Sequence, residues 1–321
     1  MTVQRIAAST SSTRASATAV RASATPVQAP GSAASGPLPG SSPTIPPVRL
    51  RLPRPYHLGR TLACGQVFRW TEREGWSVGV VDGRVWRVRQ VGGWLEVAAF
   101  PGDPALPALA RHLGLDAPLA AVERTLVRDP VLRRVLPHTT GIALMRQDLW
   151  ECLVSFVISA FNNIPKIRLS VEALARRFGR PLGAGHFAFP EPERLAEAPL
   201  RGLRACVLGY RAPYVRALAR LVADGQVDLL ALTSLPYVQA RERLLALPGV
   251  GEKVVECVLL FALGHGEAFP VDVWVERAVR RAYPDAPATL RGIRAWAQER
   301  FGLLAGYANQ HLFMGGRARL I

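Results

Sequence analysis

The stretch Leu247-Pro248-Gly249-Val250-Gly251-Glu252-Lys253-Val254 lies between two segments with helical hydrophobic spacing. Two glycines two positions apart allow a tight turn with positive φ, and their N–H groups can approach a phosphate without steric hindrance. The N-terminus of the following helix adds partial positive charge. The pattern predicts a helix-hairpin-helix element that binds one DNA strand without reading its sequence, although an ordinary turn between helices is the alternative. The predicted contacts are Gly249, Val250 and Gly251.

Lys253 falls in the first turn of the second helix of this element. The helix dipole and the apolar neighbours at 254, 255 and 258 both disfavour an ammonium ion there, and so favour a neutral, nucleophilic amine. The chain has only two lysines, Lys166 and Lys253, among 40 lysine and arginine residues. Arginine cannot lose its proton near neutral pH, so a retained lysine suggests that an amine is needed. A lysine that only pairs with a phosphate is the alternative.

A second motif, Phe269-Pro270-Val271-Asp272-Val273-Trp274, follows the lysine, and its Asp272 stands nineteen residues after Lys253. Asp272 stands where a helix is predicted to begin, so it can serve as an N-cap. Its carboxylate can also face the same cavity as Lys253, where it would stabilise positive charge on a sugar or assist proton transfer at the amine. The two roles are compatible.

The overall charge favours a nucleic-acid partner. The 321 residues are 49% hydrophobic, enough for a sizeable core, and carry a formal net charge of +16. Such a balance promotes electrostatic capture of phosphate backbones. The alternative is a compositional bias of the coding sequence toward arginine.

The spacing of the cysteines does not match that of common zinc or iron–sulfur sites. The four cysteines are too far apart for a zinc site or an iron–sulfur loop, so we predict buried free thiols, no iron–sulfur cluster and no other cofactor. No apolar run is long enough to span a membrane, and we predict no membrane partner. The cysteines are Cys64, Cys152, Cys206 and Cys257.

Three regions follow from the change of pattern along the chain. Residues 1–48 are rich in Ala, Ser, Thr and Pro without acidic residues, which predicts a disordered tail. Residues 49–125 form a β-rich N-terminal domain, with strands predicted at 66–70, 85–89 and 94–97. Residues 126–321 are helical, and the whole is predicted as α+β: a small antiparallel sheet followed by a two-lobed all-α region with the helix-hairpin-helix.

Two helical faces illustrate the helical spacing. The first ends at Gly179 and the second precedes the hairpin. Their predicted core-facing residues are Ile167, Val171, Leu174 and Phe178 in the first, and Tyr214, Leu218, Leu221 and Val222 in the second.

The combined motifs resemble the helix-hairpin-helix DNA glycosylase superfamily, and within it the 8-oxoguanine DNA glycosylase/AP lyases. The similarity extends over roughly 56–314. Besides the hairpin and the aspartate motif, five blocks carry it. These blocks are Cys64-Gly65-Gln66-Val67-Phe68-Arg69-Trp70, Glu151-Cys152-Leu153-Val154-Ser155-Phe156, Asn162-Asn163-Ile164, Leu208-Gly209-Tyr210-Arg211-Ala212 and Gly306-Tyr307-Ala308.

The resemblance implies roles around the lesion. Lys253 would attack C1′ and form a Schiff base that permits β-elimination, with Asp272 as the superfamily aspartate. The Gly65 carbonyl would accept a hydrogen bond from N7–H, which 8-oxoguanine has and guanine lacks. Cys257 and Phe313 would sandwich the extruded base.

The resemblance also implies contacts to the rest of the DNA. Tyr210 would wedge into the gap and Arg211 would bind the orphaned cytosine. Asn162 and Lys166 belong to the same DNA-facing block, in which Phe161 stands where an Asn is typical and Lys166 where an Arg often reads cytosine. These departures predict looser discrimination of the opposite base.

Two further departures concern the lesion and the adjacent backbone. Asn309 stands where Gln contacts the lesion in family members and is one methylene shorter. Trp274 replaces a His, so packing or stacking would substitute for a phosphate contact.

The sequence thus predicts a bifunctional glycosylase/AP lyase that removes 8-oxoguanine from damaged double-stranded DNA as a monomer. The alternatives are a monofunctional alkylated-base glycosylase, which would lack the nucleophilic lysine, and a non-catalytic DNA-binding protein. As in relatives, hairpin carbonyls could hold a structural cation. A cytoplasmic, nucleoid-associated location is expected in a bacterium, with organelle targeting by the tail as a minor alternative.

Overall fold

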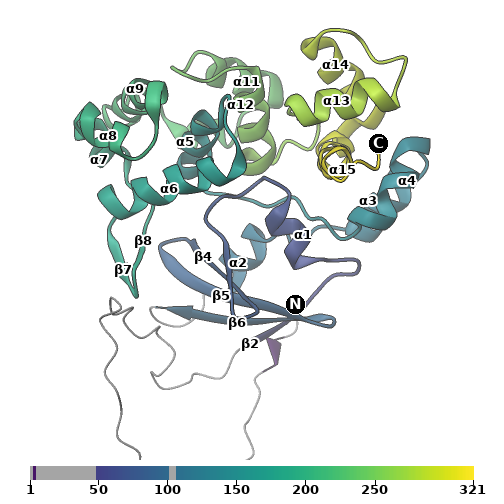
Figure 1. Cartoon of the computed structure of the whole chain (residues 1–321), viewed down its shortest axis with the longest axis horizontal. Helices are drawn as coiled ribbons and strands as arrows, with labels where there is room; N and C mark the ends of the chain where they lie inside the picture. Colours follow the sequence, from purple (N-terminus) through teal and green to yellow (C-terminus); the bar gives the residue numbers. More distant parts are fainter. Residues whose placement is uncertain (1–2, 5–47, 101–105) are drawn as a thin grey trace, which may run out of the picture.

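The computed structural model describes residues 3–4, 48–100 and 106–321. An antiparallel sheet forms one end of the molecule and helices form the other (Figure 1). The α+β class predicted from the sequence is confirmed. The predicted tail, residues 1–48, lies outside the described residues except for positions 3, 4 and 48.

The six-stranded sheet has the order β1-β2-β6-β5-β4-β3, and each neighbouring pair is antiparallel. In its centre Val88 pairs with Val97, and both side chains are buried on the face that carries the core. The strands are β1 (Val3–Gln4), β2 (Val48–Arg51), β3 (Thr71–Arg73), β4 (Trp76–Val81), β5 (Arg84–Val91) and β6 (Trp94–Phe100), with a separate ribbon of β7 (Pro181–Gly183) and β8 (His186–Phe187).

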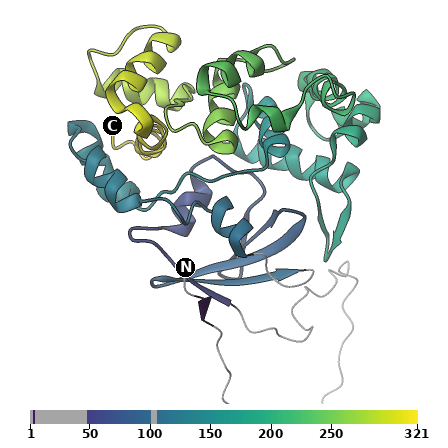
Figure 2. The same cartoon turned by 180° about the vertical axis from the view of Figure 1, so that it is seen from behind.

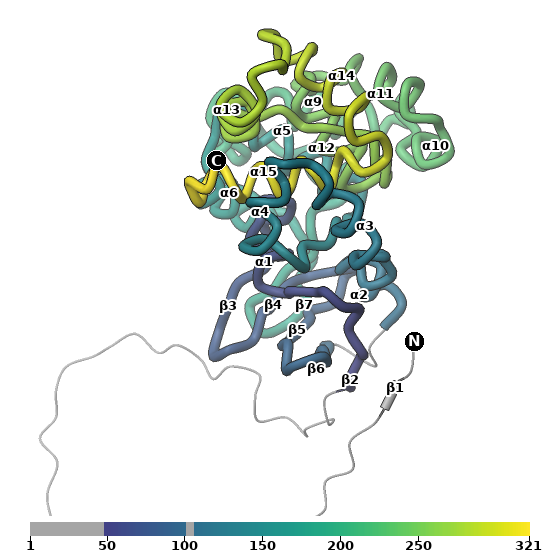
Figure 3. Tube along the Cα trace, turned by 90° about the vertical axis from the view of Figure 1, so that its right-hand side faces the viewer, coloured from purple at the N-terminus to yellow at the C-terminus, as the bar shows by residue number. Residues whose placement is uncertain are grey.

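The helices before the hairpin connect the sheet to the helical region. Helices α1 and α2 lie between the sheet and the other helices (Figures 1 and 3). These elements are α1 (Leu58–Ala63), α2 (Leu106–His112), α3 (Leu119–Leu126), α4 (Pro130–Thr139), α5 (Leu149–Ser159), α6 (Ile164–Phe178), α7 (Pro192–Glu197), α8 (Leu200–Ala205), the 3-10 turn Gly209–Arg211, α9 (Ala212–Ala223) and α10 (Leu229–Leu232).

The helices from the hairpin onward complete the fold. Helix α12 continues into a π-helical turn, so the chain stays helical well past the lysine. These elements are α11 (Tyr237–Leu245), α12 (Glu252–Val258), the π-helical turn Leu259–Leu263, α13 (Val273–Ala282), α14 (Leu290–Phe301), the 3-10 turn Gly302–Leu304 and α15 (Ala305–Arg317).

Separate hydrophobic clusters fill the sheet end and the two helical lobes. One lies between the sheet and α1 and α2, a second joins α5, α6, α9, α11 and α12, and a third joins α3, α4, α13, α14 and α15. Figure 2 shows α3 and α4 beside α15 although they are far apart in sequence. The two-lobed helical region predicted from the sequence is therefore present, and the chain passes from one lobe to the other in the loop where Ala268 belongs to the second cluster and Phe269 to the third.

The strand predicted at 66–70 is wrong, whereas those at 85–89 and 94–97 are confirmed within β5 and β6. Residues 66–70 form an irregular segment in which every residue is buried. The alternation of apolar and polar residues therefore does not correspond to a strand with one face exposed to solvent. The Gln66 amide holds this segment by donating to the carbonyl oxygens of Thr61 (3.0 Å) and Ala143 (2.9 Å). The first strand of this meander starts only at Thr71.

The helical face predicted around Tyr214 is partly wrong. Leu218 is buried as expected, but Tyr214 is 44% exposed, and the buried face of α9 is instead formed by smaller residues such as Val215 and Ala219. Tyr214 lies against the glycine turn of the hairpin, which explains why an aromatic residue stands at the edge of that face.

Two buried histidines make the stability depend on pH. Burial lowers the pKa of His112 and of His311 to about 4. The unfolded chain, with histidine pKa values near ~6.5, binds these protons first on acidification. The free energy of unfolding should therefore fall by about 2 kcal/mol per histidine between about pH 7 and 5.

We expect His311→Gln to remove about half of this pH dependence. Urea unfolding at both pH values measures it. His138→Gln, at an exposed position of α4, should keep the wild-type dependence. An unchanged dependence in His311→Gln would show that this histidine is not held neutral by burial.

Candidate active site

The glycine turn of the hairpin has the geometry that its sequence predicts. Gly249 has φ +76°, and a Cβ there would come within 2.7 Å of the Tyr214 Cβ, so both conformation and space require glycine. Val250 buries its side chain and donates its amide to the Leu247 carbonyl oxygen at 3.2 Å. Gly251 is the exposed N-cap of α12, which leaves the backbone of this turn accessible.

The Lys253 side chain points inward onto α5. Its Nζ donates to the Ser159 Oγ at 2.8 Å and lies 4.8 Å from the centroid of the Phe156 ring. The Ser159 hydroxyl in turn donates to the Phe156 carbonyl oxygen at 2.7 Å. Because the serine proton is committed to a carbonyl, its oxygen is free to accept from the amine. The amine is thereby held in one place beside an aromatic face.

Asp272 caps α13 and keeps one oxygen outside the cap. Its Oδ1 accepts from the amides of Trp274 (2.9 Å) and Val275 (2.8 Å), which confirms the predicted N-cap. The Asn309 side-chain amide donates to the Pro270 carbonyl oxygen at 2.8 Å. Asn309 is buried and thus holds the loop that carries the aspartate.

The Cys257 thiol links the lysine to the aspartate electrostatically. Burial raises the pKa of Cys257 to about 12; the nearby Lys253 opposes this rise and the Asp272 carboxylate adds to it. All three groups are therefore within electrostatic reach of one another. The thiol stays protonated near neutral pH and does not compete with the amine as a nucleophile.

The carboxylate of Glu256, one turn after the lysine, fixes the surroundings of α12. Its Oε2 accepts from the Phe269 amide at 3.0 Å, which anchors the loop leading to Asp272. Its Oε1 accepts from Tyr237 Oη (2.8 Å) and Arg241 Nε (3.0 Å), and Arg294 lies 3.5 Å away. The Glu256 side chain is only 2% exposed, so these partners replace its water.

Gly65 and Phe313 meet from opposite ends of the chain. Gly65 has φ +80°, and a Cβ there would lie 3.3 Å from the Phe313 ring and 3.4 Å from Ile164. The adjacent Gln66 is fully buried, and its Oε1 accepts from the Met145 amide at 2.9 Å, which fixes the position of Gly65. The backbone of Gly65 therefore lies next to the Phe313 ring.

Tyr210 and Arg211 lie against the turn that follows α5. Tyr210 is 56% exposed and donates its hydroxyl to the Ala160 carbonyl oxygen at 3.3 Å. The Arg211 guanidinium is buried over the Tyr210 ring and donates to the carbonyl oxygens of Ala160, Leu208 and Phe161. In this arrangement Arg211 does not face solvent, so a contact to an orphaned cytosine would require it to leave these carbonyls.

The two other predicted DNA contacts lie at the start of α6. Lys166 is exposed in its first turn, and the Asn163 side chain caps the helix by accepting from the Lys166 amide at 3.0 Å. Asn162 donates its side-chain amide to the Ile158 carbonyl oxygen at 3.1 Å, so it holds the end of α5.

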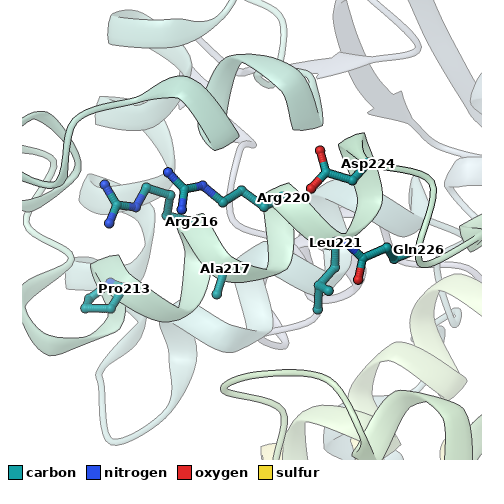
Figure 4. Close-up of a pocket in the computed structure, with 7 residues that line it drawn as sticks. All are labelled: Pro213, Arg216, Ala217, Arg220, Leu221, Asp224 and Gln226. Atoms are coloured by element: carbon teal, nitrogen blue, oxygen red, sulfur yellow. The ribbon is translucent and has the colours of Figure 1, made fainter.

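A shallow hollow of about 400 Å³ lies on the outer face of α9, apart from these groups (Figure 4). Arg216 and Arg220, four residues apart on one face, give it a basic rim. Its lining contains neither Lys253 nor Asp272. Among the described residues, no group of three or more His, Cys, Asp or Glu side chains could hold a metal ion. Within the same ranges no helix combines the length and apolarity needed to cross a membrane.

The glycine turn, the inward-facing amine and the aspartate-capped helix define a helix-hairpin-helix base excision repair protein. Residues 154–299 match the family model described as HhH-GPD superfamily base excision DNA repair protein. Residues 50–153 match the N-terminal domain of 8-oxoguanine DNA glycosylase. The chain belongs to the 8-oxoguanine DNA glycosylase family.

Relatives and solved structures agree with this assignment. The chain is 32% identical over 216 residues to the probable N-glycosylase/DNA lyase of Methanothermobacter thermautotrophicus (60% of this chain, 69% of the relative). It is 31% identical over 277 residues to N-glycosylase/DNA lyase OGG1 of Arabidopsis thaliana (79% and 75%). The Clostridium acetobutylicum 8-oxoguanine glycosylase/lyase, solved with dsDNA containing cytosine opposite 8-oxoG, superposes with a TM-score of 0.81 at 30% identity (86% and 96%).

Sequence reasoning missed the residues that position the site. Ser159 and Glu256 are polar residues within otherwise apolar helical runs, and this interruption was the available signal. In the sequence, Gln66 stands within an expected strand and within one of the five blocks, and neither assigns it a positioning role. None of the three carries a motif of its own.

We expect Glu256→Gln to lower the free energy of unfolding by about 3 kcal/mol, because a buried amide has one acceptor oxygen where both carboxylate oxygens accept, and the two largely buried arginines keep only an exposed carboxylate partner. Glu252 is the matched control, since it pairs with the same Arg241 and Arg294 but its side chain is 58% exposed. Glu252→Gln should cost less than about 1 kcal/mol. Urea unfolding measures both, and equal losses would contradict a special role for the buried carboxylate.

Proposed function

We propose that this chain is a bifunctional DNA glycosylase/AP lyase that removes 8-oxoguanine from duplex DNA. The observation that carries the proposal is the inward-facing Lys253 amine, which is hydrogen-bonded to Ser159 and lies in electrostatic reach of Asp272. A lysine needed only for a phosphate contact would extend into solvent instead.

The chemistry begins with attack of the unprotonated Lys253 amine on C1′ of the extruded nucleotide. The N–C1′ bond forms, the glycosidic bond breaks, and its electron pair leaves with the base, which takes up a proton. Ring opening with proton transfer to O4′ then gives a Schiff base. Removal of a C2′ proton expels the 3′ phosphate by β-elimination and cuts the strand.

Asp272 and Ser159 support this sequence in different ways. The Oδ2 of Asp272, outside the helix cap, can stabilise positive charge on the sugar or accept a proton from the attacking amine. Ser159 orients the amine by accepting one of its hydrogens, which leaves the lone pair of the unprotonated amine free for the attack on C1′.

The lesion pocket is proposed to lie between Gly65, Phe313 and Cys257. The Gly65 carbonyl would accept from N7–H of 8-oxoguanine, and guanine would leave that acceptor unpaired. Phe313 and Cys257 would cover the two faces of the base. Asn309 already donates to the Pro270 carbonyl oxygen, and its Oδ1 accepts from the Gln310 side-chain amide at 3.4 Å, so a contact to the base would use its second amide hydrogen.

The proposed DNA interface extends outward from this pocket. The turn Gly249-Val250-Gly251 would bind phosphates, and Tyr210 would enter the gap left by the base. Arg211 would bind the orphaned cytosine, with Asn162 and Lys166 in the DNA-facing block beside it. A cation at the hairpin would be held by backbone carbonyls and phosphate oxygens.

Three further proposals concern assembly, membranes and domain organisation. We propose that the protein acts as a monomer, since one site serves one duplex, and that it has no membrane partner. We also propose that the boundary between its two domains lies between residues 125 and 126.

The alternative functions explain fewer observations. A monofunctional alkylated-base glycosylase needs no amine nucleophile, and a non-catalytic DNA-binding protein needs neither the inward-facing Lys253 nor the free oxygen of Asp272. The relatives of at least 30% identity named above are lyases by name.

We expect borohydride to trap the wild-type protein covalently on a duplex with 8-oxoguanine opposite cytosine. Lys253→Gln should abolish the trapped band because the Schiff base cannot form. Lys166→Gln is the matched control, since Lys166 is the only other lysine of the chain and is exposed on α6; it should keep the band. A band that persists in Lys253→Gln would assign the nucleophile to another amine.

We expect Gly65→Ala to lower excision of 8-oxoguanine much more than Gly75→Ala. Both glycines have left-handed φ values (+80° and +75°), so both substitutions strain the backbone by about 1 kcal/mol. Only the Gly65 Cβ would press against Phe313, whereas no atom lies within 4 Å at Gly75. Single-turnover base release measures the effect; equal rates in the two variants would remove Gly65 from the lesion pocket.

A further inference from the structure

The two faces of the six-stranded sheet differ in composition. Trp86, Val88 and Leu95 point to the core that α1 and α2 cover. The opposite face points away from the helical region that carries Lys253 (Figures 1 and 2). Paired residues of neighbouring strands share a face, so the register decides which side chains this outer face carries. They include the arginines Arg49, Arg51, Arg73, Arg87 and Arg89 and the tryptophans Trp76 and Trp94.

A single row of side chains crosses the outer face from β2 to β3. Arg49 of β2 pairs with Glu96 of β6, and Glu96 pairs with Arg89 of β5. Arg89 lies over the ring of Trp76 of β4, and Trp76 pairs with Arg73 of β3. Neighbouring strands are about 5 Å apart, so the row places three arginines, one carboxylate and one indole side by side.

The buried carboxylate of Glu96 fixes two arginines of this row. Its Oε1 accepts from Arg49 Nη2 at 2.7 Å, and its Oε2 accepts from Arg89 Nη2 at 2.5 Å. These hydrogen bonds lower the pKa of Glu96, so it stays charged. Glu96 is 5% exposed, whereas the side chains of Arg49 and Arg89 are 37% and 43% exposed. Two guanidinium groups are therefore held in place with solvent access, and they lose little rotamer entropy on binding an anion.

Two indole rings lie among the arginines. The guanidinium carbons of Arg89 and Arg87 lie 4.4 Å and 5.1 Å from the centroid of the Trp76 ring. Trp94, at the other side of the outer face, is partly exposed and pairs with the exposed Arg51 of the neighbouring strand. The outer face thus combines positive charge with an accessible aromatic ring.

The surroundings of the outer face do not neutralise its charge. The ribbon of β7 and β8 packs on the apolar side chains of Val78 and Val85 at one side. Residues 5–47, which precede β2 in the chain, contain three arginines and no acidic residue, so this segment offers no carboxylate to the outer face. Five arginines there share the single buried carboxylate of Glu96.

The ligand that fits this surface is anionic and has free aromatic faces. Surplus guanidinium groups favour phosphates, and a tryptophan beside an arginine favours base stacking. A duplex keeps its base faces within its own stack, so it would use the charges but not the ring of Trp94. A single strand offers phosphates and unstacked bases together, as in the recognition of single strands on other β-sheets.

We propose that the outer face of the sheet is a second nucleic-acid site, which binds a single strand. The arginines hold phosphates, and Trp94 stacks on a base. The site lies on the side of the sheet away from Lys253, so a strand can be bound there while a duplex occupies the active site (Figure 1). The inference goes beyond the proposed glycosylase function and does not depend on it.

Reversal of two exposed charges tests the electrostatic part. Fluorescence anisotropy measures the binding of a labelled oligothymidine of about twelve nucleotides, and a uridine oligomer of equal length tests RNA as the source of the strand. The double variant Arg51→Glu/Arg73→Glu should lower strand affinity at least about tenfold. The slope of log K against log salt should become shallower by about 1.4, since each phosphate contact to a single strand contributes about 0.7. Affinity for an 8-oxoguanine duplex should change by less than about twofold.

Replacement of the partly exposed indole tests the stacking part. Trp94→Ala should lower strand affinity roughly tenfold, because one base loses its aromatic partner, and should leave the salt slope unchanged. Trp94→Phe keeps a ring and should restore most of the affinity. The midpoint of thermal unfolding, measured for each variant, separates lost binding from lost folding.

A matched double variant controls for net charge. Arg124 and Arg128 are exposed at the C-terminal end of α3, and Arg124→Glu/Arg128→Glu makes the same change in charge away from the outer face. At about 0.15 M salt, where charges more than about 8 Å apart are largely screened, it should keep wild-type strand affinity.

Four results would overturn the proposal. The first is a wild-type protein that binds neither strand, and the second is displacement of the bound strand by saturating 8-oxoguanine duplex. The third is wild-type strand affinity in folded Arg51→Glu/Arg73→Glu and Trp94→Ala, which would leave the outer face to another anionic partner. The fourth is an equal loss in the two double variants, which would indicate a general effect of charge.

Discussion

The buried carboxylate of Glu256 is the interaction on which the arrangement of the site depends. It lies on the same helix as Lys253, accepts from the Phe269 amide before the aspartate loop, and pairs with Arg241 of α11 and Arg294 of α14. A carboxylate without water is stable only with such partners. One side chain thereby fixes the amine-bearing helix relative to Asp272 and to both neighbouring helices.

Helix α5 supplies the other half of the arrangement. Its last turn positions the amine through Ser159, and the turn that follows presents Phe161. That segment is braced by Arg211, so the residue that the resemblance implies as a cytosine contact has a structural task as well.

The sequence predicted what depends on local chemistry. The glycine turn, the first-turn lysine and the N-cap at Asp272 each leave a mark within a few residues, and the α+β class follows from the change of hydrophobic period. Alternation alone does not tell which residues will be buried, so the sequence predicts a strand at 66–70 where the chain forms a buried irregular segment. The brace between Arg211 and the carbonyls of residues 160 and 161 joins positions about fifty apart, and no local pattern encodes such a contact.

The most direct test of the account is to locate the covalent bond. The borohydride-reduced complex with 8-oxoguanine DNA can be digested and the modified peptide identified by mass spectrometry. We expect a deoxyribose remnant on the ε-amine of Lys253 and none on Lys166 or the N-terminal amine. A remnant on either of those two amines, with Lys253 unmodified, would contradict it.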